Sequence, residues 1–253
     1  PHTICSPLVF VNQDLVERAM PVDASRAAFN RWRWSDFTAV CEALIASGKE
    51  VSVNVGIWGM WRHLSRLPLS QMSDDQLRVL FDASLPFLKH LYTHTNPKDK
   101  IHICYQQKDA PTQFINQEVG LFCGYPLHLH HLLDHCDFRW DIAAMPCSEL
   151  GVPTHEAMIN CVNAKSQNKE AAWLFIKHMT SPDVQRRLLQ ANMLFPIRPE
   201  LYDTKPASEG TPLNMGRILA FFKNSQTYAV SSHSLYILYE NIIHPALEAY
   251  FIG

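Results

Sequence analysis

Short apolar runs alternate with helix-forming segments along most of the chain. Residues 8–11 are apolar, with β-branched and aromatic side chains typical of a buried strand, and residues 119–123 and 141–146 have the same character. Between them lie segments with helical spacing of apolar residues, most clearly residues 37–46, which end at Gly48. Because strands that alternate with helices form a sheet covered by helices, the sequence predicts an α/β fold.

The helix predicted at 168–179 carries the strongest packing signal. The small side chains of Ala171 and Ala172 would let it approach a sheet closely, and Trp173 and Phe175 are expected to fill the core. Ile176 and Trp140 are assigned to the core as well, by the same argument.

Cap residues and apolar spacing predict the remaining elements. Ser181 is expected to cap a second C-terminal helix, with Pro182 at its first position. The other predicted elements are helices at 15–20, 112–117, 127–133, 214–224 and 232–251, and strands at 49–55 and 159–162.

Bulk composition excludes several classes of protein. With 47% hydrophobic and 18% charged residues the chain is typical of a folded globular protein. Its formal net charge of −2 provides no general attraction for nucleic acid, so we expect no direct nucleic-acid contact. It has no uninterrupted apolar run of about 18 residues, so we expect no membrane span.

The sequence lacks the common enzyme motifs but contains one cluster of histidines. The sequence contains no G-x-S-x-G, no H-E-x-x-H and no glycine-rich phosphate loop, so we expect neither an enzyme nor a cofactor. A histidine cluster invites a zinc hypothesis, because His131 and His135 are four residues apart on a predicted helix. We favour a solvated histidine-rich face and expect no metal. The cluster consists of His128, His130, His131 and His135, with Cys136 beside it.

Several motifs, taken in order, resemble those of one protein family. Asn12, Asp14 and Leu15 match a box of tyrosine, asparagine, lysine, aspartate and leucine. Residues 34–37 resemble a helix start of tryptophan, acidic residues and an apolar residue, and residues 124–126 fall at a glycine-proline-tryptophan turn. These motifs are similar to those of the extracellular solute-binding proteins of ABC sugar importers, family 1.

The most specific resemblance covers residues 160–200. Residues 165–177 resemble a serine-lysine-asparagine motif followed by glutamate-alanine-alanine-tryptophan, and residues 180–185 resemble threonine-serine-proline-glutamate-glutamine. Residues 195–198 match a leucine-proline-alanine-arginine turn. There are two departures. The family has a further segment before its first box, and residues 156–158 stand where it has a glycine-tryptophan-glycine cleft motif.

The resemblance implies a fold and a function. The fold would be that of type II, bilobed periplasmic binding proteins, here mostly the C-terminal lobe with a partial N-terminal lobe. Residues 1–204 would form the C-terminal lobe, including the first crossover strand, and 205–253 a connection and helices returning toward the N-terminal lobe. The function would be carbohydrate or oligosaccharide binding by hinge closure, for uptake through an ABC permease. The location would be periplasmic or extracellular, with a lipid anchor as one form.

Three features favour an alternative use of the same fold. Residues 1–7 do not resemble a signal peptide, and the cleft motif at 156–158 is altered. Seven scattered cysteines are more typical of a reducing compartment. The alternative is the ligand-sensing domain of a cytoplasmic transcriptional regulator. The cysteines are Cys5, Cys41, Cys104, Cys123, Cys136, Cys147 and Cys161.

The resemblance also implies candidate ligand contacts. Family ligands lie at the hinge, where aromatic faces stack on sugar rings and polar groups bind hydroxyls. Tyr125, beside Gly124, has the best motif support. The other candidates are Trp58, Trp61, His155, Glu156 and Met158.

Overall fold

The computed structural model describes the chain in several segments. These are residues 3–4, 6–20, 33–48, 53–54, 110–146, 154–155, 157–203, 214–223 and 226–227, with isolated positions between 73 and 89 and between 241 and 250. The predicted helix at 232–251 lies largely outside them.

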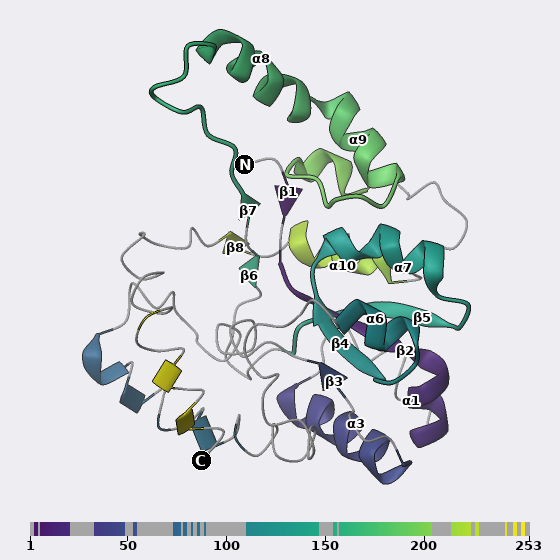
Figure 1. The fold of residues 1–253 in the computed structure, drawn as a ribbon. Helices are drawn as coiled ribbons and strands as arrows, with labels where there is room; N and C mark the ends of the chain where they lie inside the picture. The colour runs from purple at the N-terminus through teal and green to yellow at the C-terminus, as the bar shows by residue number, and fades with distance from the viewer. Residues whose placement is uncertain are drawn as a thin grey trace.

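A four-stranded sheet lies at the centre of the described residues (Figure 1). Its order is β3 (Val53–Asn54), β4 (Leu121–Gly124), β2 (Leu8–Asn12) and β5 (Trp140–Ala144). β2 is antiparallel to both β4 and β5, while β3 is parallel to β4, so β3, β4 and β5 run in one direction. Every residue of β2 is buried, as the predicted apolar run requires.

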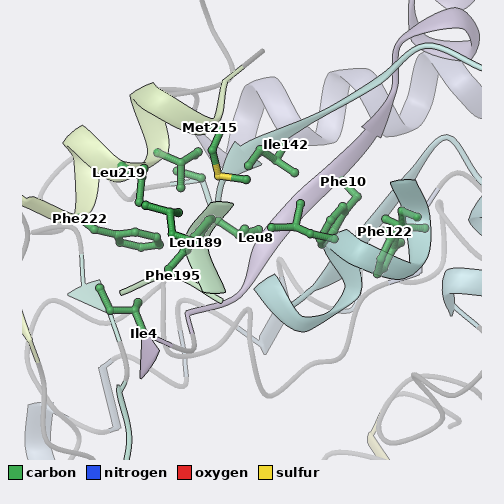
Figure 2. Close-up of a cluster of buried hydrophobic side chains, with 14 of the residues drawn as sticks. Ile4, Leu8, Phe10, Phe122, Ile142, Leu189, Phe195, Met215, Leu219 and Phe222 are labelled. Carbon is green, nitrogen blue, oxygen red and sulfur yellow. The ribbon is translucent and has the colours of Figure 1, made fainter. Parts of the chain in front are cut away.

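One face of the sheet is covered by three helices. They are α6 (Ala110–Ile115), α7 (Leu129–His135) and α10 (Met215–Lys223). Phe10 and Phe122 stack at 4.4 Å between ring centroids, and Ile142 continues this layer beneath α10 (Figure 2). Trp140 is half-buried and lies 6.1 Å from the Phe10 ring, which confirms its predicted place at the core.

The other face is covered by α1 (Gln13–Ala19) and α3 (Trp34–Ala46), which contact each other. α3 lies against β4, because its Leu44 side chain fills the space beside Gly120. Gly48 ends α3 with φ of +94°, a conformation that favours glycine. The helix predicted at 37–46 is therefore confirmed, with a start three residues earlier.

Two short ladders extend from the sheet. β1 (Thr3–Ile4) pairs with β7 (Ala157–Met158), and β6 (Thr154–His155) pairs with β8 (Gln226–Thr227). The strand predicted at 159–162 is wrong, since these residues join no ladder. The pairing of β7 with β1 ends at Met158, opposite Thr3.

The C-terminal part of the described chain contains α8 (Lys169–Met179), α9 (Pro182–Gln190) and the short 3-10 helix η3 (Pro199–Leu201). Gln185, fully buried on α9, donates to the Met179 carbonyl at 2.8 Å and accepts from the Ile197 N–H at 3.1 Å. Both helices lie where they were predicted, and a glutamine joins them to the turn that follows.

The core role predicted for α8 is wrong. Trp173, Leu174 and Phe175 are 53%, 62% and 61% exposed, Ile176 is only half-buried, and no residue of α8 is buried. Among the described elements α8 contacts α9 and extends away from the sheet (Figure 1), so Ala171 and Ala172 do not pack on it.

Ser181 takes the N-cap position of α9, as predicted, but its side chain makes no cap hydrogen bond. Ser181 precedes α9, but its hydroxyl donates to the His178 carbonyl at 2.7 Å and accepts no hydrogen bond from the helix. The hydroxyl instead satisfies a carbonyl at the end of α8. Pro182 at the first position, with its fixed φ, starts α9 without a side-chain cap.

Candidate ligand-binding site

The carboxyl ends of three strands meet at one edge of the sheet. β3, β4 and β5 run in the same direction, so the residues that follow Gly124 and Ala144 lie along that edge. In sheets of this kind ligands bind in the crevice outside the carboxyl ends of strands. Tyr125 comes directly after β4 and therefore lies at this edge, as does Pro7, which precedes β2.

Tyr125 begins a tight turn at the edge. It has extended backbone, with φ of −122° and ψ of 161°, and the 3-10 helix η2 (Pro126–His128) follows it. Pro126 suits the first position of that helix, because its fixed φ matches the helix and its missing N–H needs no partner. Tyr125 is half-buried and Leu127 is 60% exposed, so the turn presents an aromatic and an apolar side chain at the surface.

Gly124 and His128 hold this turn. A Cβ at position 124 would collide with the Phe122 ring and would lie 2.7 Å from Nδ1 of His128. Only glycine leaves room for the imidazole, whose Nδ1 accepts a hydrogen bond from the Tyr125 N–H at 3.0 Å. Burial of the ring lowers the pKa of His128; the backbone hydrogen bond with Tyr125 acts in the opposite direction, the nearby His131 lowers the pKa further, and the net shift is downward.

His128 is the site residue that sequence analysis missed. It was placed on a solvated histidine-rich face, yet it is half-buried against the core. The available signal was Pro126, because a 3-10 turn that starts there brings position 128 back over the strand end. The exposed histidines of this cluster are His130, His131 and His135.

Met158 lies near the same edge, on β7. Thr3 pairs with Met158 and Leu8 pairs with Gly124. The chain between Thr3 and Leu8 spans at most about 18 Å, because an extended residue covers at most about 3.6 Å. Met158 is 46% exposed and its neighbour Ile159 is 67% exposed, so β7 and the residue after it present apolar surface.

Of the remaining four candidates, the structure describes only the backbone of His155. The backbone of His155 lies in β6, paired through Thr227 to β8. Trp58, Trp61 and Glu156 lie outside the described residues. Of the six candidates, the structure places Tyr125 directly after β4 at the carboxyl edge and Met158 on β7, beside β1.

Comparison with known proteins assigns the family. A family model described as bacterial extracellular solute-binding protein matches residues 1–213. This chain belongs to that family. No curated protein sequence matches the chain.

Solved structures of family-like proteins share the fold. Maltose-bound MalE3 of T. maritima has a TM-score of 0.76 at 18% identity, over 99% of this chain and 66% of that one. Lmo0181 from Listeria monocytogenes, an ABC substrate-binding protein in complex with cycloalternan, has a TM-score of 0.71 at 16% identity, over 99% and 65%. An ABC transporter solute-binding protein from Thermotoga lettingae, bound with α-D-tagatose, has 0.71 at 15%, over 100% and 67%.

These matches confirm the predicted fold class, that of periplasmic binding proteins. The chain spans less than two thirds of the length of the first two structures. The family is extracellular, and the three structures are binding proteins, so the cytoplasmic regulator gains no support. Within the described segments, none of the helices has the length and hydrophobicity needed to cross a membrane.

The exposed histidines do not form a metal centre with other ligands. The rings of His131 and His135 lie 4.3 Å apart, and Nδ1 of His135 lies 2.8 Å from the His131 carbonyl oxygen. His130 faces Asp134 at 3.7 Å. Among the described residues no group of three or more metal-binding side chains is present.

A charged depression of about 590 Å³ lies at the opposite edge of the sheet, where β5 begins. Arg139 bridges Asp14 and Glu17 there, with its terminal nitrogen 2.6 Å and 2.7 Å from the two carboxylates. Burial would raise the pKa of Asp14, but hydrogen bonds from the Arg139 backbone and side chain outweigh it and lower that pKa. These charges satisfy one another and attach α1 to β5, so they form a structural cluster.

Most of the described cysteines are buried or half-buried side chains. Cys41 and Cys123 are buried, Cys136 is half-buried and Cys161 is exposed, and all four are thiols rather than disulfides. Burial raises the pKa of Cys136 to about 12, and raises that of Cys123 well above its usual value. Protonated buried thiols are inert apolar side chains. The buried thiols of Cys41 and Cys123 are therefore explained by packing and give no indication of the compartment.

Proposed function

We propose that this member of the family binds a sugar or oligosaccharide at the carboxyl edge of its sheet and delivers it to an ABC permease. The observation that carries the proposal is Tyr125, placed half-buried directly after β4 at that edge. Further support comes from similar folds whose structures contain maltose, cycloalternan or α-D-tagatose. The protein would act outside the cytoplasm, in the periplasm or at the cell surface.

Tyrosine suits this role physically. Its ring offers a flat apolar face to the C–H groups of a sugar, while its hydroxyl can bind water or a sugar hydroxyl. Met158 would add a polarisable, adaptable surface near the ring. The other proposed contacts are Trp58, Trp61, His155 and Glu156.

Binding would work through closure of two lobes. Residues 1–204 would form the C-terminal lobe and residues 205–253 a connection with helices that return toward the N-terminal lobe. A ligand shifts such an equilibrium only by its differential affinity for the closed form. An aromatic ring at the edge of one lobe would raise the affinity of the closed form, in which the opposing lobe contacts the other side of the ligand. The role is binding for transport and involves no chemical change in the solute.

The test is calorimetric titration of the full chain with maltose, maltotriose and tagatose. We expect one sugar to bind, and Tyr125→Ala to weaken it at least about tenfold, equivalent to about 1.4 kcal/mol. Tyr125→Phe keeps the ring face and should stay within about threefold, because a single solvent-exposed hydroxyl bond contributes little.

Trp173→Ala is the matched control, since it removes an exposed ring from α8. It should bind like the wild type. Absence of binding for all three sugars would contradict the proposed function, and wild-type affinity in Tyr125→Ala would contradict the proposed contact.

A further inference from the structure

Tyr125 and His128 exchange two hydrogen bonds. The Tyr125 N–H donates to Nδ1 of His128 at 3.0 Å, and the His128 N–H donates to the Tyr125 carbonyl at 2.9 Å. The first bond has a side-chain acceptor, so it requires a particular residue type at position 128. The second closes the 3-10 turn and needs only backbone. Together they fix the backbone from which the tyrosine ring departs.

The imidazole has a rigid seat. Its ring meets Phe10 edge-on at 6.2 Å and Phe122 edge-on at 5.6 Å, and these two phenyl rings are fully buried and stacked on each other. The backbone of Gly124 forms the remaining wall, where a Cβ would lie 2.7 Å from Nδ1. A ring confined on three sides keeps Nδ1 directed at the Tyr125 N–H.

The hydrogen bond requires a particular protonation state. Nδ1 can accept the Tyr125 N–H only when it carries no proton, so the neutral ring must be protonated on Nε2. An imidazolium would place two N–H groups face to face and would break the contact. Burial lowers the pKa of His128, which keeps the accepting form populated at neutral pH.

We infer that His128 is a positioning residue for the ligand-binding turn, and that protonation of its ring releases Tyr125 and weakens solute binding. This inference rests on the proposed function, because it assigns the regulation of the same site. The trigger is acidification outside the cell. The consequence is a solute affinity that falls as the pH drops below the pKa of His128.

The surroundings of the ring identify His128 as the titrating group. β2 and β4 direct Phe10, Phe122 and Gly124 at it, and none of these titrates. α7 contributes His131, which acts on His128 electrostatically. In the described part of the chain, α6, which contacts α7, carries no titratable residue.

A ligand-free measurement tests the positioning role directly. The Tyr125 amide is followed by hydrogen exchange in the full chain at pH 7.5. His128→Phe keeps an aromatic ring but loses the acceptor, and the amide should exchange at least about tenfold faster. His128→Asn places Oδ1 where Nδ1 was and should retain most of the protection. Equal protection in wild type, His128→Phe and His128→Asn would overturn the inference whether or not a sugar binds.

The binding measurement uses the tightest-binding sugar among maltose, maltotriose and tagatose, from pH 5 to 8. Wild-type affinity should be constant above about pH 6.5 and fall below it, since the ring titrates under its ordinary pKa. His128→Asn should bind like the wild type at pH 7.5 and lose the pH dependence. His128→Phe should bind about tenfold more weakly at every pH. Unchanged pH dependence in His128→Asn would overturn the inference.

His131→Asn is the matched control on the neighbouring helix. It leaves the acceptor in place, so affinity at pH 7.5 should not change. Because His131 lowers the pKa of His128, its removal should move the midpoint of the pH profile upward. A midpoint that stays in place, or moves down, would contradict His128 as the titrating group. Failure of all sugars to bind while the exchange results hold would contradict the proposed function alone.

Discussion

Arg198 donates a hydrogen bond from Nε to the Thr180 carbonyl oxygen at 2.7 Å. This contact attaches the turn after α9 to the junction between α8 and α9. Gln185 lies beside it and binds both the Met179 carbonyl and the Ile197 N–H. Arg198 and Gln185 therefore have a structural role: their polar side chains bind backbone groups where two helices and a turn meet.

Gln185→Ala should lower the free energy of unfolding by about 2 kcal/mol, since it removes the side-chain partner of a partly buried carbonyl and a partly buried N–H. Urea denaturation measures the change. Gln167→Ala is the control, because Gln167 is exposed, and it should stay within about 0.5 kcal/mol of the wild type. A loss below about 1 kcal/mol in Gln185→Ala would mean that water replaces the side chain.

Replacement by alanine should change the stability of the protein in opposite directions at two glycines. In Gly124→Ala the new Cβ collides with Phe122 and His128, which should cost about 1–3 kcal/mol. In Gly216→Ala, on α10, the new Cβ meets nothing within 4 Å, and the lower entropy of the unfolded chain should stabilise the protein by about 0.5 kcal/mol. Thermal denaturation of the two variants checks the pair. Equal effects would contradict the packing around Gly124.

Asn12 caps α1, and its Oδ1 accepts the Leu15 N–H at 2.9 Å. Its Nδ2 is buried with no hydrogen-bond partner among the described residues. Asn12→Ala should cost about 1 kcal/mol through loss of the cap. Asn12→Ser keeps an acceptor and removes the amide, so it should cost less than Asn12→Ala. Chemical denaturation distinguishes them, and an equal or larger loss in Asn12→Ser would contradict the capping role of the side-chain acceptor.

Asp14 should contribute stability that depends on pH. Its folded-state pKa is lowered by Arg139 despite burial, so its contribution is complete above the unfolded pKa and disappears as the pH falls through the folded value. Asp14→Asn should lower Tm by about 2 °C at pH 7. The difference from wild type should vanish at the lowest pH at which both fold. Asp75→Asn, at an exposed position, should show no such pH-dependent difference.

Much of the fold followed from local pattern. The strands near residues 8–11 and 141–146 and the helices at 37–46, 168–179 and 214–224 were predicted within a few residues. Each has apolar spacing that matches its own geometry. The ordered motifs near residues 165–198 also indicated the family, which the family match confirmed.

The candidate site was less accessible to prediction. Tyr125 and Met158 were named from their motif positions, and their ligand contacts stay predictions. His128 escaped notice, because its role depends on a 3-10 turn and on two phenylalanines from separate strands. Pairing between distant strands carries no local signature.

The sequence by itself determined which segments become strands and helices, because apolar periodicity and cap residues act over a few positions. It also determined the family, through motifs in a fixed order. Only the tertiary structure decided which apolar faces are buried. α8 has the composition of a core helix, yet Trp173 and Phe175 are exposed, since burial requires a surface to pack against and no described element besides α9 supplies one. The same dependence on distant neighbours placed the imidazole of His128 against Phe10 and Phe122, where it can hold the Tyr125 turn.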